Sequence, residues 1–276
     1  MTTFEKIIKY GATAFAAVLA VGIVVGVLEL GLSIVRTITG RNVERTDIIS
    51  TFSVEDIQAI TMNNSAADVI IEYYEGDEIT VDAKNVPVTF KCTTDNNGIL
   101  TIKNNSIKNT FLSFSIGKTK SKITLHLPMD FELSRLDLNG GVGDVIIHDL
   151  KIDMLTINGG VGDINASGLS VDKFTYKGGV GDFDMKSCTI NTTKIDGGVG
   201  DVTIENSLLK DIDIDNGVGD IEIEIKGNID DYSFDIDKGL GDIEINGRKP
   251  SYYKENNGQY KISCDSGIGD IEITIK

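Results

Sequence analysis

The chain has 276 residues, enough for one long domain or two of ordinary size, and 41% of them are hydrophobic. It carries 26 lysine and arginine residues against 42 aspartate and glutamate residues, which gives a formal net charge of −16. Such an acidic surface repels nucleic acid and attracts cations and basic partners, so the sequence argues against nucleic-acid binding.

Residues 1–9 form a short N-terminal segment, and an uncharged, mostly apolar run follows at 10–28. Nineteen residues in a helix would span about 28 Å, close to the hydrocarbon thickness of a bilayer. Further apolar residues continue to Val35. A cleaved signal peptide has a shorter apolar core and a recognisable cleavage site. The sequence therefore predicts one uncleaved transmembrane helix within 10–35, which contacts the membrane through residues 10–28.

Lysines and arginines flank both ends of this run, so charge alone does not decide which side of the membrane the rest occupies. Residues 36–52 are predicted to be a polar linker. Short strand-like runs and turn signals then fill 53–130, which we expect to be an irregular β part that caps the following repeats. Asp68 resembles the repeats described next, because it lies 76 residues before Asp144, or four repeat periods.

The second half of the chain is dominated by a repeated Gly-x-Gly-Asp motif. Five copies have Gly-Val-Gly-Asp with their aspartates 19 residues apart, and two variants follow that end at Asp242 and Asp270. Apolar residues alternate within each unit, which is a strand pattern. A fixed period of this size indicates stacked repeats. The paired glycines are predicted to form tight corners: Gly141, Gly143, Gly160, Gly162, Gly179, Gly181, Gly198, Gly200, Gly217 and Gly219.

The predicted fold is therefore all-β: a right-handed parallel β-solenoid over 131–276 with two or three strands per 19-residue repeat, preceded by one transmembrane helix. Coils would lie about 4.8 Å apart. The valine of each motif is expected to form an interior rib. An insertion at 247–260 is predicted to be a hairpin that covers part of the last coil.

With these repeats, the chain resembles the bacterial putative-adhesin β-strand-repeat family, which includes the LiaG-like envelope proteins. The resemblance rests on the N-terminal apolar segment, on Leu125-His126-Leu127-Pro128 before the repeats, and on the Gly-x-Gly-Asp units, and it covers about residues 50–276. It implies an extracytoplasmic, membrane-tethered solenoid with no assigned catalytic residues. Fold alone does not establish function.

The repeated aspartates are the sharpest chemical candidates. Stacking like charges at about 4.8 Å costs each pair roughly 1 kcal/mol in water, so something should offset the repulsion. One explanation is that the aspartates accept backbone hydrogen bonds at the corners. The alternative is a Ca²⁺ ladder, since Ca²⁺ binds six to eight oxygen ligands. The metal candidates would be Asp144, Asp163, Asp182, Asp201 and Asp220, with no other cofactor indicated.

No catalytic residues are indicated. His126 and His148 lie in strand patterns without a recognisable nucleophile motif, and Gly141-Val142-Gly143 lacks the third glycine of a dinucleotide site. Cys92, Cys188 and Cys264 are scattered, which is typical of buried thiols, and one disulfide with a spare thiol stays open. The sequence therefore predicts a protein that is not an enzyme.

Three functions fit this description. The first is a surface-binding protein of the cell envelope, anchored in the cell membrane with an extracytoplasmic solenoid that presents a face to an envelope polymer, glycan or protein. The second is an accessory protein of envelope-stress signalling that acts through a membrane partner. The third is a self-associating scaffold, because open solenoid ends pair readily.

Overall fold

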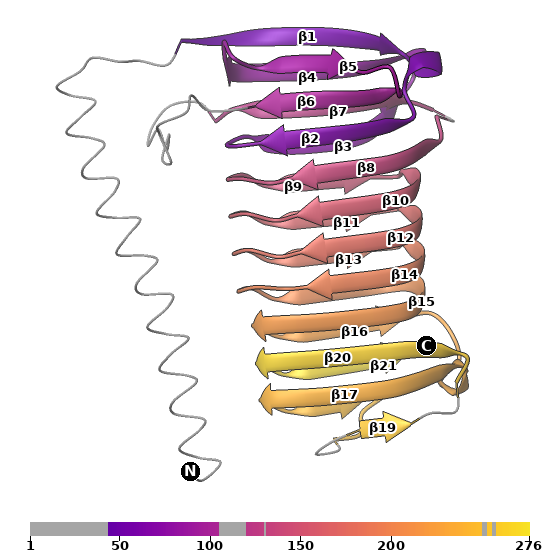
Figure 1. Ribbon diagram of the computed structural model, residues 1–276. Helices are drawn as coiled ribbons and strands as arrows, with labels where there is room; N and C mark the ends of the chain where they lie inside the picture. Colours follow the sequence, from indigo (N-terminus) through magenta and orange to yellow (C-terminus); the bar gives the residue numbers. More distant parts are fainter. Residues whose placement is uncertain (1–43, 105–119, 130, 250–252, 256–257) are drawn as a thin grey trace, which may run out of the picture.

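A computed structural model of the chain describes residues 44–104, 120–129, 131–249, 253–255 and 258–276 (Figure 1). Within these ranges, no helix has the length and apolar character needed to cross a membrane. The predicted anchor at 10–35 lies outside the described residues and stays a prediction.

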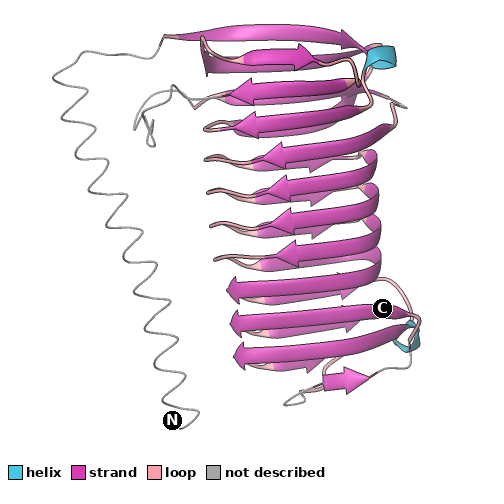
Figure 2. Ribbon diagram, in the orientation of Figure 1, coloured by secondary structure: helices cyan, strands magenta, loops and turns pink. Residues whose placement is uncertain are grey.

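The described chain forms an elongated stack of coils built from two facing sheets, A and B (Figures 1 and 2). Each regular coil adds one strand to sheet B, turns a corner, and adds the next strand to sheet A. The long strand β15 continues from sheet A into sheet B and so joins the two. The regular strands are β8 (Leu133–Asn139), β9 (Val145–His148), β10 (Lys151–Asn158), β11 (Ile164–Ser167), β12 (Ser170–Lys177), β13 (Phe183–Lys186), β14 (Thr189–Asp196), β15 (Val202–Val218) and β16 (Ile221–Ile225).

Parallel, in-register pairing explains the period of the sequence. Leu155 lies beside Phe174 in sheet B and Ile164 lies beside Phe183 in sheet A, each pair separated by 19 residues. The predicted all-β, parallel solenoid is confirmed for the described residues. Each coil has two strands rather than three, because the segment expected as a third strand continues directly into the next sheet B strand, as Ile152 does within β10.

Two further coils precede β8, and their order in space differs from their order in the chain. β2 and β3 pair directly with β8 and β9, whereas β6 and β7, which come later in the sequence, pair on the far side of β2 and β3. β1, β4 and β5 cover this end. These strands are β1 (Arg45–Ser53), β2 (Ala59–Asn64), β3 (Asp68–Tyr74), β4 (Glu78–Pro87), β5 (Lys91–Thr94), β6 (Ile99–Asn104) and β7 (Lys122–Pro128).

β1 occupies residues that the sequence assigned to the linker. Its partly buried Ile48 and Phe52 pack against the core, so the strand is held by burial as well as by its pairing with β4. Single-turn 3-10 helices, η1 (Val54–Asp56) and η2 (Ile229–Asp231), are the helices among the described residues.

The order of coils is also exchanged at the C-terminal end. The last coil of the chain, β20 and β21, inserts between β15/β16 and the coil of β17 and β18. Within the predicted insertion at 247–260, β19 pairs antiparallel with β17, and Ile245 bridges Arg248 across a tight turn. The strands are β17 (Tyr232–Leu240), β18 (Ile243–Ile245), β19 (Tyr253–Glu255), β20 (Tyr260–Ile268) and β21 (Ile271–Ile275).

The core consists of apolar columns between the two sheets, since the inward residues of successive coils lie above one another. One column in sheet B contains Leu136, Leu155, Phe174, Thr193 and Ile212. All five are buried. Burial of apolar area at about 25 cal/mol per Å² in each coil is therefore the main stabilising contribution.

Thr193 is the polar exception in this column. It is 1% exposed, and its hydroxyl has no hydrogen-bond partner among the described residues. Valine has nearly the same shape and removes the buried hydroxyl, so Thr193→Val is expected to stabilise the protein by about 1 kcal/mol. Thermal unfolding should show a midpoint raised by roughly 2–4 °C. An unchanged or lowered midpoint would mean that the hydroxyl is satisfied in solution.

Candidate functional surface at the glycine corner

The repeated motif forms the corner at which each coil passes from sheet B to sheet A. Neighbouring corners bond to each other: Val161 N–H donates to Gly141 O at 2.8 Å, and Gly162 N–H donates to Val180 O at 2.9 Å. The valines bridge one another in parallel along the whole column, from Val142 to Val218. The corner is therefore a continuous hydrogen-bonded ribbon and not a flexible loop.

Both motif glycines are required by this close approach, for different reasons. A Cβ on Gly160 would lie 1.9 Å from Gly141 O. Gly162 has a φ of +142°, and a Cβ there would lie 2.3 Å from Gly143 O. The same contacts recur in the following coils, as at Gly179 and Gly181.

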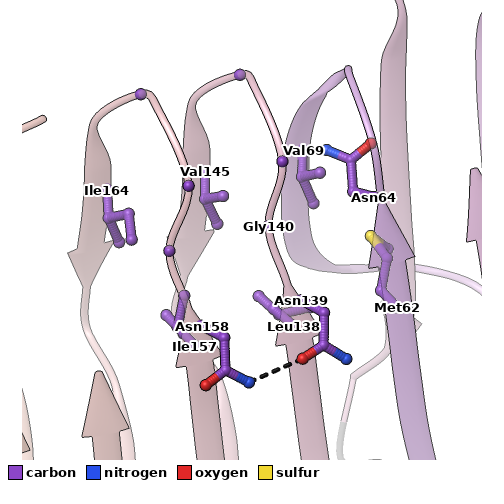
Figure 3. A pocket seen from close by; sticks show the side chains of 15 residues that line it. Met62, Asn64, Val69, Leu138, Asn139, Gly140, Val145, Ile157, Asn158 and Ile164 are labelled. Atoms are coloured by element: carbon purple, nitrogen blue, oxygen red, sulfur yellow. Dashed lines mark hydrogen bonds between the residues drawn. The ribbon is translucent and has the colours of Figure 1, made fainter. Parts of the chain in front are cut away.

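The glycine-lined interior of the corner contains one small cavity, shown in Figure 3. Its volume of about 20 Å³ has room for about one water molecule and not for a metabolite. The side chains around it come from neighbouring coils, including Met62, Val69 and Ile157. Beside it, Asn158 Nδ2 donates to Asn139 Oδ1 at 2.8 Å (Figure 3).

The expectation that the motif valines form an interior rib is wrong. Val161 is 50% exposed and Val180 is 49% exposed. The core position at each corner belongs to residues of the flanking strands, such as Ile157 and Ile164, and the valine between them points outward. An apolar column therefore runs along the outer edge of the solenoid; it comprises Ala66, Val142, Val161, Val180, Val199, Val218, Ile268 and Leu240.

The motif aspartates form a second column beside the apolar one. Except in the last coil of the column, each Oδ1 accepts a hydrogen bond from the backbone N–H of the aspartate in the next coil, as Asp163 does from Asp182 at 3.0 Å. The donor–acceptor distances range from 2.7 to 3.2 Å. In spatial order the column is Asp68, Asp144, Asp163, Asp182, Asp201, Asp220, Asp270 and Asp242. The carboxylates therefore link coils through backbone amides, which offsets part of their mutual repulsion.

The alternative interpretation of this column was a Ca²⁺ ladder at Asp144, Asp163, Asp182, Asp201 and Asp220. Over the ranges that the structure describes, no three histidine, cysteine, aspartate or glutamate side chains are arranged to hold a metal ion. In each coil one oxygen of the carboxylate is already occupied by an amide. The column therefore offers fewer free oxygens per coil than Ca²⁺ normally requires.

A further acidic column, which the sequence analysis did not identify, lies on the other side of the apolar column. It is formed in the last four coils by Asp196, Asp215, Asp265 and Asp237. The signal was present as Asp-x-Gly-x-Gly-Asp, which replaces the earlier Asn- or Lys-containing copies such as Asn158-Gly-Gly-Val-Gly-Asp163. Partial burial and the carboxylates of Asp215 and Asp237 raise the pKa of the Asp265 carboxyl.

Crowding of carboxylates also affects the outward face of sheet A. Partial burial raises the pKa of Asp184, and Asp182 and Asp163 raise it further. Since the folded pKa lies above the ordinary value of 3.8, charged Asp184 destabilises the fold at neutral pH. Asp184→Asn is expected to raise the thermal midpoint at pH 7 by on the order of 1 °C. This gain in the thermal midpoint should fade as the pH drops through the raised pKa towards 3.8, because Asp184 then becomes neutral in the folded protein. A gain that does not depend on pH would contradict the proposed cause.

Charge is distributed unevenly along the stack. Residues 196–276 contain 8 lysine and arginine residues against 19 acidic ones, a net charge of −11. The described residues 44–104 and 120–129 contain 6 lysine and arginine residues against 11 acidic ones, a net charge of −5. The strands of the two regions lie at opposite ends of the stack (Figure 1). The C-terminal coils therefore form an acidic pole.

The two histidines lie on the outward face of sheet A. His126 Nδ1 is 3.2 Å from Glu72 Oε1, an ion pair only when the imidazole is protonated. His148 Nδ1 lies 2.7 Å from Ser167 Oγ, in the next coil and one period away in sequence. In the part of the chain that is described, no third group bonds to His148, whereas a catalytic imidazole is normally oriented by one.

The three cysteines are free thiols, with Cys188 and Cys264 buried and Cys92 half-buried. Burial raises the pKa of Cys92, and a hydrogen bond with Ser50 lowers it by a smaller amount, so that the pKa is about 11. Burial also raises the pKa of Cys188 and of Cys264. Thiols of this kind are poor nucleophiles at neutral pH.

The corner motif and the stacked strands agree with a comparison of sequences. Residues 57–275 match the Toastrack DUF4097 family. The chain belongs to this family. The uncharacterised putative-adhesin family predicted from the repeats is thus confirmed. No curated protein matches the chain.

Several crystal structures resemble this Toastrack chain. A putative cell adhesion protein from Clostridium sporogenes has 15% identity and a TM-score of 0.36, over 84% of this chain and 100% of its own. A putative adhesin from Bacteroides fragilis has 17% identity and a TM-score of 0.43, over 84% of this chain and 98% of its own. A putative lipid binding protein from Parabacteroides distasonis has 18% identity and a TM-score of 0.35, over 85% of this chain and 98% of its own. These TM-scores are too low for the likenesses to carry an argument about function.

Proposed function

We propose that this Toastrack protein is a non-enzymatic surface-binding protein of the bacterial cell envelope, held in the cell membrane by residues 10–28 with its solenoid on the extracytoplasmic side. The corner edge at the acidic pole is its binding surface, and the partner is a basic protein segment. The apolar column between two carboxylate columns is the observation that carries this proposal.

Three consecutive coils show the arrangement. Val199 lies between Asp196 and Asp201 in the sequence of its corner, and the next two coils repeat it with Val218 and Ile268. Asp196 pairs with Lys194, whereas the other column aspartates of these three corners form no ion pair within the described residues. They are Asp201, Asp215, Asp220, Asp265 and Asp270.

A basic amphipathic segment complements such a surface, because its apolar side chains cover the partly exposed column while its lysines or arginines meet the carboxylates. Charge complementarity of this kind raises the association rate and excludes anionic partners such as nucleic acid or acidic polymers. The backbone hydrogen bonds between corners hold the surface rigid, which lowers the entropy cost of binding.

Binding can be tested with the full chain in detergent micelles and a fluorescent peptide of alternating lysine and leucine. Saturable binding that weakens with salt is expected. Asp215→Asn combined with Asp265→Asn should weaken it about tenfold, whereas Asp153→Asn combined with Asp172→Asn, on the same sheet but away from the pole, should not. Equal loss in both double variants, or no binding to the basic peptide, would contradict the proposed surface.

Sidedness needs a separate experiment. A cysteine introduced at the exposed Ser170 should react with a membrane-impermeant maleimide in intact cells, while the native thiols stay unlabelled because burial raises their pKa values. Labelling only after lysis would overturn the extracytoplasmic placement, and the basic-peptide result would stand independently of it.

A further inference from the structure

The two ends of the stack are protected to very different degrees. At the C-terminal end, the outermost strands β18 and β19 have three residues each, and β18 is followed at once by a tight turn through Ile245 and Arg248. At the opposite end, β1 has nine residues and pairs with β4 alone among the described strands (Figure 1). Within the described residues, its other edge therefore carries a long row of backbone groups that pair with no strand.

The later part of β1, after Arg45 and Asp47, lacks the features that normally protect an edge strand. Its stretch 48–52 contains no charged residue and no proline, and its only register shift lies earlier, between Thr46 and Ile48. Ile49 is 71% exposed, more than any other large apolar side chain in the described chain. An uncharged, partly apolar stretch of edge strand such as 48–52 is a template for pairing with another strand.

We propose that β1 is a self-association edge, on which the β1 of a second copy pairs antiparallel so that sheet A continues from one molecule into the other. A twofold axis generates antiparallel pairing of identical strands. It also keeps Glu55 and Asp56, which follow β1, away from the same residues of the second copy. Parallel pairing would place these carboxylates side by side.

Charge favours a second copy as the occupant in spite of the net charge of −16. β1 belongs to the less acidic end of the stack, and it lies ten strands away from β18 in sheet A. At about 4.8 Å per strand the acidic pole is roughly 48 Å away, several Debye lengths at physiological salt. Pairing through β1 sends the two acidic poles in opposite directions, so their repulsion does not oppose it.

The experiment is the mass of the full chain in detergent micelles, measured by light scattering with the detergent contribution subtracted. The unaltered chain is expected to be a dimer, and Ile49→Lys is expected to be a monomer, because a charge on the edge strand blocks pairing. Leu208→Lys is the matched control, since Leu208 is 48% exposed and lies on β15, far from β1; this variant should stay a dimer.

Two results would overturn the proposal. One is a monomeric unaltered chain at all concentrations. The other is a dimer that survives Ile49→Lys but is lost with Gly22→Leu and Gly26→Leu. These two glycines form a small-xxx-small pair in the apolar run, so this result would assign association to the predicted membrane helix. A spin label on Ile49→Cys should report a second label nearby, and one on Leu208→Cys should not. Equal thermal midpoints of the two lysine variants would show that neither change acts by unfolding the chain.

Discussion

Gly181→Ala, a single methyl addition at a corner, is expected to cause a large loss of stability. Gly181 has a φ of +141°, where an L side chain is strained, and the added Cβ would lie 2.2 Å from Gly162 O. Strain in this region costs about 1–3 kcal/mol, and the contact with backbone cannot be relieved by a side-chain rotation. The coils on either side would have to separate, so a total loss of roughly 3 kcal/mol or more is expected in denaturant unfolding.

Gly247→Ala is the control for this prediction. Gly247 also has a positive φ, +77°, but a Cβ there would meet nothing within 4 Å. Its expected loss is about 1 kcal/mol, from backbone strain alone. If the two variants lost the same free energy of unfolding, successive corners would not approach closely in solution. The glycines would then be needed only because they tolerate a positive φ.

The period of the sequence was sufficient to predict the register of the regular coils. Residues 19 apart pair from β8 to β15 because identical units stack most favourably without any shift. The direction of the motif valine was predicted wrongly for a local reason. Alternation of apolar and polar residues identifies the inward side of a strand. At the corner, the residues on both sides of the valine are glycines, so no alternation shows which way the valine points; in the structure Val161 points outward.

The spatial order of the end coils could not be predicted from the repeats. The spacing from Asp220 to Asp242 and on to Asp270 suggests a simple succession. In the structure Asp270 N–H donates to Asp220 Oδ1, and Asp242 N–H donates to Asp270 Oδ1. Both coils have the same Asp-x-Gly-x-Gly-Asp corner, so either could follow Asp220 with the same local bonds. Connections between strands decide the order, and they carry no repeat signal.

Asp68 illustrates the same limit at the other end. Its distance of 76 residues from Asp144 is four periods, which suggests three coils between them. The structure places the two in adjacent coils, with Asp144 N–H donating to Asp68 Oδ1 at 3.2 Å. The intervening chain forms β4 to β7 and extends the stack outward. The sequence thus identified the members of the aspartate column but not their hydrogen-bond partners, which depend on which coils are adjacent.

The aspartate column gives the second large expected effect. Changing Asp163, Asp182 and Asp201 together to alanine removes three side-chain acceptors of backbone N–H groups, at 3.0, 2.9 and 2.8 Å. About 1 kcal/mol for each exposed bond gives a total loss of roughly 3 kcal/mol, or about 6–12 °C in the thermal midpoint. The corresponding asparagine variant is expected to keep or exceed the original midpoint, because its Oδ1 still accepts the amide and the mutual repulsion is gone.

Calcium separates this explanation from a metal ladder. The unaltered full chain should show the same midpoint in EDTA and in millimolar Ca²⁺, because the carboxylates bond to amides. A saturable rise in Ca²⁺ that is absent from the asparagine variant would instead establish a metal site, since a ligand that binds only the folded state raises its stability with concentration. The asparagine variant is the informative control, because it keeps the hydrogen bonds and loses only the charges that Ca²⁺ would need.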